Sequence, residues 1–132
     1  MGAVLGIGVD LVSVERIAIL RRRHGSRFLA RVFTEHELRD HGIESAPDER
    51  LAARFAAKEA VMKALGTGWA AGVGFKQIEV SNLPSGQPVA QLTGQAAERA
   101  RLLGAEHIHL TISNQQQWAV AVALLEGKDA PA

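Results

Sequence analysis

Apolar residues follow a strand-like pattern in some segments of this chain and a helical spacing in others. Residues 4–14 are mostly Val, Ile and Leu with two glycines, which predicts a strand buried over most of its length. Apolar residues recur at helical spacing over residues 48–65, and Gly66 stands at the usual stop position, so we predict the longest helix there. Residues 75–83 alternate as a strand does, and a turn leads from them into a second strand at residues 89–92. These two strands predict a hairpin.

Shorter helices are predicted between the first strand and the long helix. Ser13 can cap a helix that Gly25 ends, and residues 26–32 predict one further helical segment. Thr34 and Glu37 have the spacing of a capping box, so a third helix is expected to begin there.

The C-terminal third predicts one more helix, at residues 93–103, and a last hairpin formed by residues 108–113 and 118–126. Helices and strands thus mix without a regular βαβ repeat. We therefore expect the α+β class, with a largely antiparallel sheet packed with helices. Residues 1–126 should form a single domain, and residues 127–132 a flexible C-terminal tail.

Composition narrows the choices further. A chain of 132 residues with 47% hydrophobic side chains supports one core, but a roomy site for a large cofactor would need a neighbouring subunit. The chain has no cysteine, which excludes disulfides and thiol nucleophiles and is compatible with a cytoplasmic protein. No apolar run approaches the roughly twenty residues that a membrane span needs, so no membrane association is expected.

Basic side chains gather on one segment. Residues 16–31 contain no carboxylate and six arginines: Arg16, Arg21, Arg22, Arg23, Arg27 and Arg31. Such a segment can dock an acidic protein, contact nucleic-acid phosphates, or form a solvated face without a partner. Two Trp, four Phe and no Tyr offer few stacking platforms, and no recognition motif accompanies the arginines. We therefore expect no nucleic acid as partner.

Asp10 interrupts an apolar run, where an ionised carboxylate costs several kcal/mol unless it is paired or binds a cation. Alternatively, the strand ends near Val9 and Asp10 caps a turn. Glu59 and Lys63, four apart on the predicted helix, could form an ordinary exposed ion pair. With the glycine-rich loop that begins at Gly66, however, two carboxylates and a lysine suit a magnesium ion held against phosphate groups.

Several motifs occur in a characteristic order along the chain. They are GIGVDL at 6–11, FTEHE at 33–37, RFAAKEAVMKALGTG at 54–68, IEV at 78–80, GQP at 86–88 and LTIS at 110–113. In this order and spacing the chain resembles the holo-[acyl-carrier-protein] synthases, the short trimeric type of the 4'-phosphopantetheinyl transferase family. The resemblance covers nearly the whole chain and is most specific at residues 54–68.

The resemblance implies a magnesium-dependent enzyme of fatty acid biosynthesis. It would transfer 4'-phosphopantetheine from coenzyme A to a serine of apo acyl carrier protein and release 3',5'-ADP. Asp10 and Glu59 would hold Mg2+, and Lys63 would lie near the phosphate under attack. Glu59 and Lys63 are therefore the expected catalytic residues, with Glu59 as general base, directly or through a metal-bound water.

The resemblance also implies that coenzyme A binds between adjacent subunits of a homotrimer. The expected cofactor-binding residues are Arg54, Lys63, Gly66, Thr67, Gly68, Pro88, Thr111 and Ser113. The expected docking residues for acyl carrier protein are Arg16, Arg23, Arg27 and Arg31.

Two positions depart from the family pattern. Asn114 stands where many members have histidine, and an amide can hydrogen-bond a phosphate but cannot act as a base. Gln87 replaces a common basic residue, so the phosphate contact there is weaker or comes from elsewhere. His107 and His109, two apart on a predicted strand, are interpreted as surface residues rather than metal ligands. The alternative function is a non-catalytic module that binds carrier protein or nucleic acid through residues 16–31.

Overall fold

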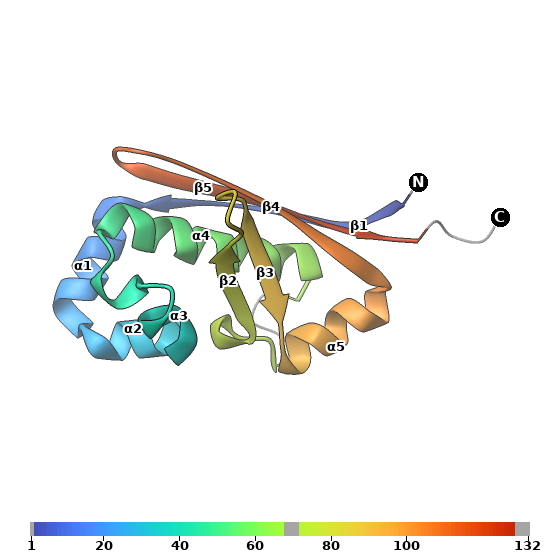
Figure 1. Cartoon of the computed structure of the whole chain (residues 1–132), viewed down its shortest axis with the longest axis horizontal. Coiled ribbons are helices and arrows are strands. Elements are labelled where there is room, and N and C mark those ends of the chain that lie inside the picture. The colour runs from blue at the N-terminus through green and yellow to red at the C-terminus, as the bar shows by residue number, and fades with distance from the viewer. Residues whose placement is uncertain (1, 68–71, 129–132) are drawn as a thin grey trace.

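A three-stranded antiparallel sheet forms one layer of the molecule, and the helices lie beneath it (Figure 1). The structure, a computed structural model, describes residues 2–67 and 72–128. The strand order is β1–β5–β4, with β1 at Ala3–Ser13, β5 at Trp118–Gly127 and β4 at Ala105–Gln115. The first strand and the last hairpin are confirmed. The hairpin is longer than predicted because pairing continues to Ala105 and Gly127.

Helix α4, Asp48–Leu65, packs on the inner face of this sheet. The backbone of this helix lies so close to β1 that two positions of the strand must be glycine. A Cβ atom at Gly6 would collide with the carbonyl oxygen of Ala64, and one at Gly8 with that of Ala60. The backbone of α4 can therefore lie against β1 only because both positions lack a side chain.

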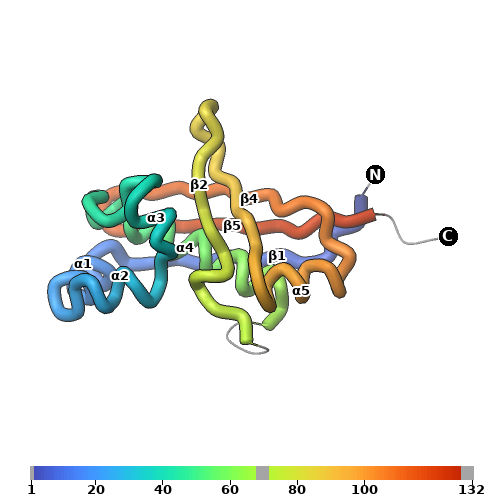
Figure 2. The backbone as a smooth tube through the Cα atoms, turned by 60° about the horizontal axis from the view of Figure 1, so that its bottom comes forward, coloured from blue at the N-terminus to red at the C-terminus, as the bar shows by residue number. Residues whose placement is uncertain are grey.

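A second, two-stranded sheet contributes to the other side of α4 and projects beyond the main sheet (Figure 2). It consists of β2, Ile78–Asn82, and β3, Pro88–Leu92. The predicted hairpin is confirmed, but its first strand begins only at Ile78. The preceding Phe75–Gln77 form a 3-10 turn, η3, because the Gln77 amide donates to the Gly74 carbonyl instead of to a neighbouring strand. Between two layers, α4 is buried nearly all round, whereas the sequence indicated a single apolar stripe.

Short helices fill the end of the molecule where β1 finishes. They are α1 at Val14–His24, α2 at Ser26–Val32, α3 at Glu35–Arg39 and the 3-10 turn η1 at Ile43–Ser45. The predicted caps are confirmed: Ser13 Oγ accepts a hydrogen bond from the Arg16 amide, and Thr34 and Glu37 form a reciprocal capping box. Helix α5, Gly94–Leu103, connects β3 to β4 at the opposite end. Among the described helices, none combines the length and apolar character needed to cross a bilayer.

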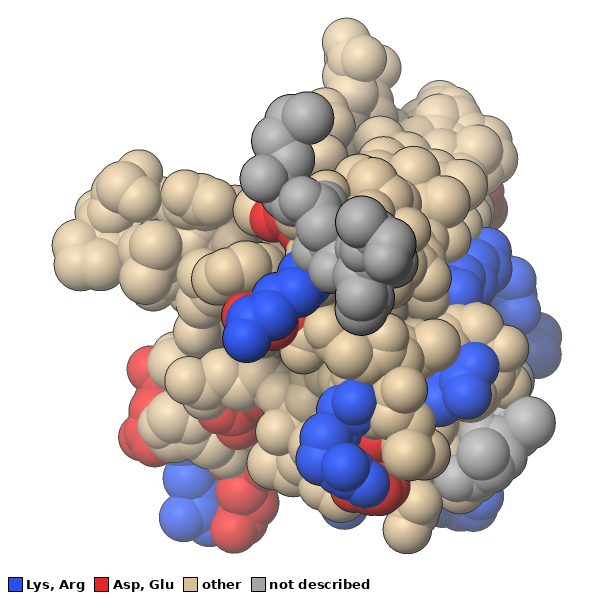
Figure 3. Space-filling view, turned by 90° about the vertical axis from the view of Figure 1, so that its right-hand side faces the viewer, with Lys and Arg blue, Asp and Glu red and all other residues tan. Residues whose placement is uncertain are grey.

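Within residues 2–67 and 72–128, no helix or strand covers the outer face of the three-stranded sheet (Figure 1). Ile7, Val9 and Leu11 of β1 point outward there and are more than half exposed. Figure 3 shows few charged side chains on the upper surface, which the sheet forms, while Lys, Arg, Asp and Glu gather on the helical side below. The expected fold class, a single α+β domain with largely antiparallel pairing, is confirmed.

Candidate active site

Asp10 and Lys63 meet where β1 crosses the last turns of α4. Lys63 Nζ lies 3.0 Å from Asp10 Oδ1 and donates a second hydrogen bond to the Val9 carbonyl oxygen, also 3.0 Å away. The Asp10 side chain is only 13% exposed, in the middle of a continuous strand. The alternative in which the strand stops at Val9 and Asp10 caps a turn is therefore wrong.

Glu59 lies one turn before Lys63, on the same face of α4, and completes an acidic site. Burial raises the pKa of Glu59, and the charge of the nearby Asp10 raises it further. The positive charges of Lys63 and Arg16 only partly offset this rise. Among the described residues Glu59 has no hydrogen bond or ion pair. The alternative of an ordinary Glu59–Lys63 ion pair is therefore wrong, and Lys63 pairs with Asp10 instead.

Two carboxylates with such mutual repulsion are stabilised by a cation. The donor atoms are carboxylate oxygens, which are the ligands that Mg2+ prefers, and one or two of them suffice when water and phosphate complete the octahedron. The residues present therefore fit the magnesium ion that the sequence implied. One strand and one helix hold them, and both are anchored by the close packing at Gly6 and Gly8.

Arg54 lines a separate cleft of about 380 Å³ together with Asn82, Pro88 and Asn114. Its side chain is buried, and burial lowers the pKa of its guanidinium. One nitrogen, Nη2, donates to Asn82 Oδ1, while the buried Nη1 has no hydrogen-bond partner among the described residues. An unpaired buried guanidinium nitrogen is costly, which indicates that an anionic ligand completes this cleft.

The remaining expected cofactor-binding residues lie elsewhere in the chain. Thr111 and Ser113 are exposed and project from β4 on the outer face of the sheet, because β-strand side chains alternate and Ile112 between them faces the Arg54 cleft. Gly66 caps α4 with a φ of 78°, and Thr67 follows it. Gly68 lies outside the described residues. Among the described residues, the expected coenzyme A contacts therefore do not line one pocket.

Among the arginines of residues 16–31, Arg21 holds two helices together, and the others are exposed. Arg21 donates to the carbonyl oxygens of Glu44 and Ala46 and pairs with Asp48 at 3.3 Å, so it joins α1 to the start of α4. The expected docking residues, by contrast, are all exposed: Arg16, Arg23, Arg27 and Arg31.

Two shallow hollows that share Leu20 connect three of these exposed arginines. Arg27 and Arg31 line one hollow, and Arg16 lines the other. The charge of Arg16 also acts on Glu59. The exposed arginines therefore extend from α2 to the edge of the acidic site.

Sequence reasoning missed a buried ion pair beneath this site. Lys58 and Glu37 are both fully buried, with Nζ and Oε1 2.6 Å apart. The available signals were a lysine among the apolar positions of α4 and a glutamate in a capping box. Each signal is also typical of an exposed helix residue. His107 and His109 are exposed on the edge strand β4, which confirms their interpretation as surface residues, and His109 pairs with Glu126.

Comparison with known proteins identifies the family. The profile of the 4'-phosphopantetheinyl transferase superfamily matches residues 6–123. The holo-[acyl-carrier-protein] synthase of Koribacter versatilis is 46% identical over 123 residues, which cover 93% of this chain and 98% of that protein.

Solved structures agree with this match. The holo-[acyl-carrier-protein] synthase of Neisseria meningitidis superposes with a TM-score of 0.85 at 32% identity, covering 93% of this chain and 98% of its own. The Bacillus anthracis enzyme, solved in complex with CoA (3',5'-ADP), gives a TM-score of 0.76 at 32% identity over 95% of this chain and 98% of its own. These matches favour the enzyme over the non-catalytic binding module. The chain belongs to the 4'-phosphopantetheinyl transferase superfamily.

Proposed function

We propose that this protein is a holo-[acyl-carrier-protein] synthase, which transfers 4'-phosphopantetheine from coenzyme A to a serine of apo acyl carrier protein. The serine oxygen forms a bond to the β-phosphorus, the bond from that phosphorus to the bridging oxygen breaks, and 3',5'-ADP leaves. The observation that carries the proposal is the Asp10–Lys63 contact, together with the charge of Asp10 acting on Glu59, in a chain of this family.

Asp10 and Glu59 would hold Mg2+ in this site. When bound, the ion would neutralise charge on the diphosphate of coenzyme A. Lys63 is the fixed cation of the site, and its ammonium group stabilises negative charge that develops on the departing phosphate oxygen. Asp10 and the Val9 carbonyl position that ammonium group.

Glu59 is the proposed general base, which takes the proton of the serine hydroxyl. It would act directly or through a metal-bound water, because the same carboxylate also holds the ion. It also stands on a rigid helix whose neighbouring residue, Lys58, is anchored in the core. This combination supports Glu59 and Lys63 as the catalytic pair.

Coenzyme A would bind between subunits of a homotrimer. Asp10, Glu59 and Lys63 do not line the cleft that contains Arg54, Pro88 and Asn114, which supports a site completed by a second copy of the chain. The uncovered outer face of the sheet offers a surface for this association, because its β1 residues are apolar and exposed. Thr111 and Ser113 lie on the same face, and Gly66 and Thr67 would meet the phosphates from the end of α4.

Acyl carrier protein would dock on the exposed arginines Arg16, Arg23, Arg27 and Arg31. Complementary charge accelerates encounter with an acidic partner and sets its orientation. Arg16 acts on Glu59 through its charge, and the hollow beside it continues through Leu20 to Arg27 and Arg31. A carrier bound there would present its serine at the acidic site.

Mass spectrometry of an apo carrier protein tests the activity. The carrier should gain the phosphopantetheine mass only when enzyme, coenzyme A and Mg2+ are all present. Asp10→Asn and Glu59→Gln should each lower the rate by at least about a hundredfold, since each removes a charge from the site. Glu106→Gln, an exposed substitution on β4, should leave the rate unchanged. Carriers that remain unmodified across several acidic candidates would contradict the proposal.

A further inference from the structure

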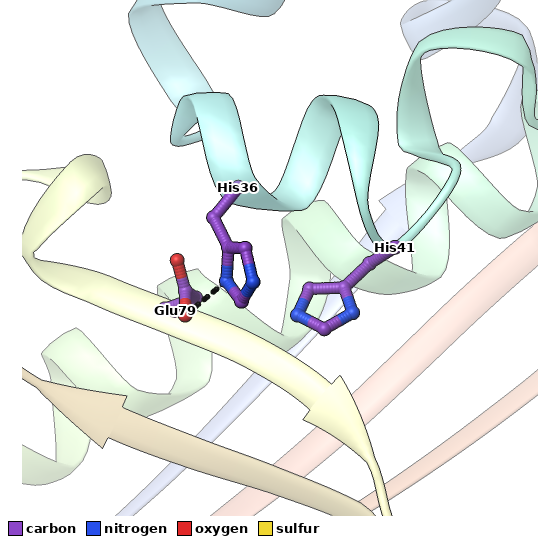
Figure 4. Close-up of side chains that lie close together, drawn as sticks. All are labelled: His36, His41 and Glu79. Atoms are coloured by element: carbon purple, nitrogen blue, oxygen red, sulfur yellow. Dashed lines mark hydrogen bonds and ion pairs between the residues drawn. The ribbon is translucent and has the colours of Figure 1, made fainter.

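A second group of side chains with metal-ligand chemistry lies away from the acidic site, where the end of α3 faces β2. His36 belongs to α3, His41 follows that helix, and Glu79 belongs to β2. One ligand atom from each lies within 4.8 Å of the other two. Figure 4 shows the two imidazole rings on the helix side and the Glu79 carboxylate on the strand, all turned toward one space.

The local backbone holds these residues in place. The capping box of Thr34 and Glu37 fixes the start of α3. At its end, the His41 amide donates to the His36 carbonyl at 3.2 Å, and Arg50 Nη2 donates to the His41 carbonyl at 3.1 Å. The backbone that carries His36 and His41 is therefore fixed by hydrogen bonds.

In His36 and Glu79, the atom that would not bind the metal already has a hydrogen-bond or ion-pair partner, as is usual for metal ligands. Thr34 Oγ1 donates to Glu79 Oε1 at 2.7 Å, and His36 Nε2 lies 3.1 Å from Asp40 Oδ2. Those contacts leave Glu79 Oε2 and His36 Nδ1 facing each other at 3.1 Å. A carboxylate behind a ligating imidazole and a hydrogen bond behind a ligating carboxylate are the common outer shell of zinc sites.

We propose that His36, His41 and Glu79 bind one divalent transition-metal ion such as Zn2+. Two imidazoles and a carboxylate are suitable zinc ligands, with a water in the fourth position. Zinc bonds of about 2.1 Å place neighbouring ligand atoms about 3.4 Å apart, close to the observed 3.1 Å between His36 and Glu79. The other separations, at most 4.8 Å, close by small side-chain rotations.

This site differs in chemistry and place from the acidic site. Asp10 and Glu59 offer only carboxylate oxygens, which favour Mg2+, whereas imidazole nitrogens favour softer ions. A bound ion would join the end of α3 to β2, the strand that ends at Asn82 in the Arg54 cleft. The ion would therefore stiffen one wall of that cleft.

Calorimetric titration of the full chain with Zn2+, after chelator treatment and with excess Mg2+ present, tests the site. One ion should bind per chain, and His41→Ala should weaken binding at least tenfold. His109→Ala is the matched control, because His109 also pairs with a glutamate, Glu126, at 3.0 Å but is not part of a three-ligand group among the described residues. Equal loss in both variants would overturn the proposal.

Nuclear magnetic resonance of the unmutated protein locates the ion without relying on a variant that might misfold. Zn2+ should shift the ring resonances of His36 and His41 and leave those of His24 and His109 in place. A titration without binding, or shifts confined to other histidines, would refute the site. Neither measurement uses coenzyme A or carrier protein, so the result is independent of the transferase assay.

Discussion

The ammonium nitrogen of Lys58 lies 2.6 Å from Oε1 of Glu37 in the interior of the protein, and both side chains are fully buried. Lys58 also donates to the carbonyl oxygens of Phe75 and Ile78, and the Val80 amide donates to the second Glu37 oxygen. The pair thus joins α3, α4 and β2 through charged groups whose hydrogen bonds are satisfied. Lys58 directly precedes Glu59, so the buried pair holds in place the segment of α4 that carries Glu59.

Removal of either member of this pair should destabilise the fold strongly. Lys58→Met leaves the Glu37 carboxylate buried without its cation, which costs about 3–5 kcal/mol in the free energy of unfolding. Urea denaturation measures that cost. The double variant Lys58→Met with Glu37→Gln should lose much less than the sum of the two single variants, since no uncompensated charge remains. Additive losses would contradict the coupling.

Gly8→Ala tests the close contact between β1 and α4. The added Cβ would meet the Ala60 carbonyl oxygen, which is part of the helix backbone and cannot turn away. We expect a loss of about 1–3 kcal/mol in stability and a larger loss of activity, because Asp10 shifts relative to Glu59. Gly74→Ala is the control, since a Cβ there meets nothing within 4 Å and the backbone φ is −132°. Similar losses in both variants would show that the close contact between Gly8 and Ala60 is not the cause of the loss.

Much of the local structure could be predicted from the sequence, because its signals are local. Ser13, the Thr34–Glu37 capping box and Gly66 mark helix ends through contacts within a few residues, and each lies where expected. The Lys63–Asp10 contact joins residues 53 positions apart, whereas helical spacing offered only Glu59 as an alternative ion-pair partner for Lys63. The glycine-rich loop after the helix suggested Asp10 and Glu59 as magnesium ligands, and the resemblance to a family supported the same pair.

The burial of α4 on both sides could not be predicted from the sequence either. A helix that contains lysine and arginine among alanines has the composition of a half-exposed helix. Only the tertiary contacts show that Arg54 and Lys58 point into the protein and find polar partners there.

Lys63→Met should lower the rate of transfer without unfolding the protein. The lysine is about half exposed and contributes a charge at the site rather than core packing. We expect a reduction of about a hundredfold in kcat, with a smaller change in the KM for coenzyme A, if Lys63 acts mainly in the transition state. Lys76→Met, at an exposed lysine on η3, should keep full activity. A change confined to KM would assign Lys63 to ground-state binding.

The oligomeric state tests the uncovered sheet face. Leu11→Glu places a charge in the apolar surface that we propose as the subunit interface, so it should convert a trimer of the 14.1 kDa chain into monomers. Light scattering coupled to gel filtration measures the mass, and transfer activity should fall with it. Leu102→Glu on α5 is the matched control, because Leu102 is 66% exposed, against 61% for Leu11, but lies on a different element. A wild-type monomer that is fully active would refute the shared site.

Arg27→Glu separates carrier docking from coenzyme A binding. Arg27 lines the hollow with Leu20 and Phe28 at the end of the molecule where α1 and α2 lie. Reversal of its charge should slow transfer to an acidic carrier about tenfold or more at low salt, because charge attraction mainly accelerates encounter. The defect should shrink as salt screens the interaction, since the Debye length falls to about 8 Å near 0.15 M. Lys76→Glu makes the same charge change on η3 and should not alter the rate. If Arg27→Glu weakens coenzyme A binding as much as it slows carrier modification, the arginine serves the nucleotide and the docking face must lie elsewhere.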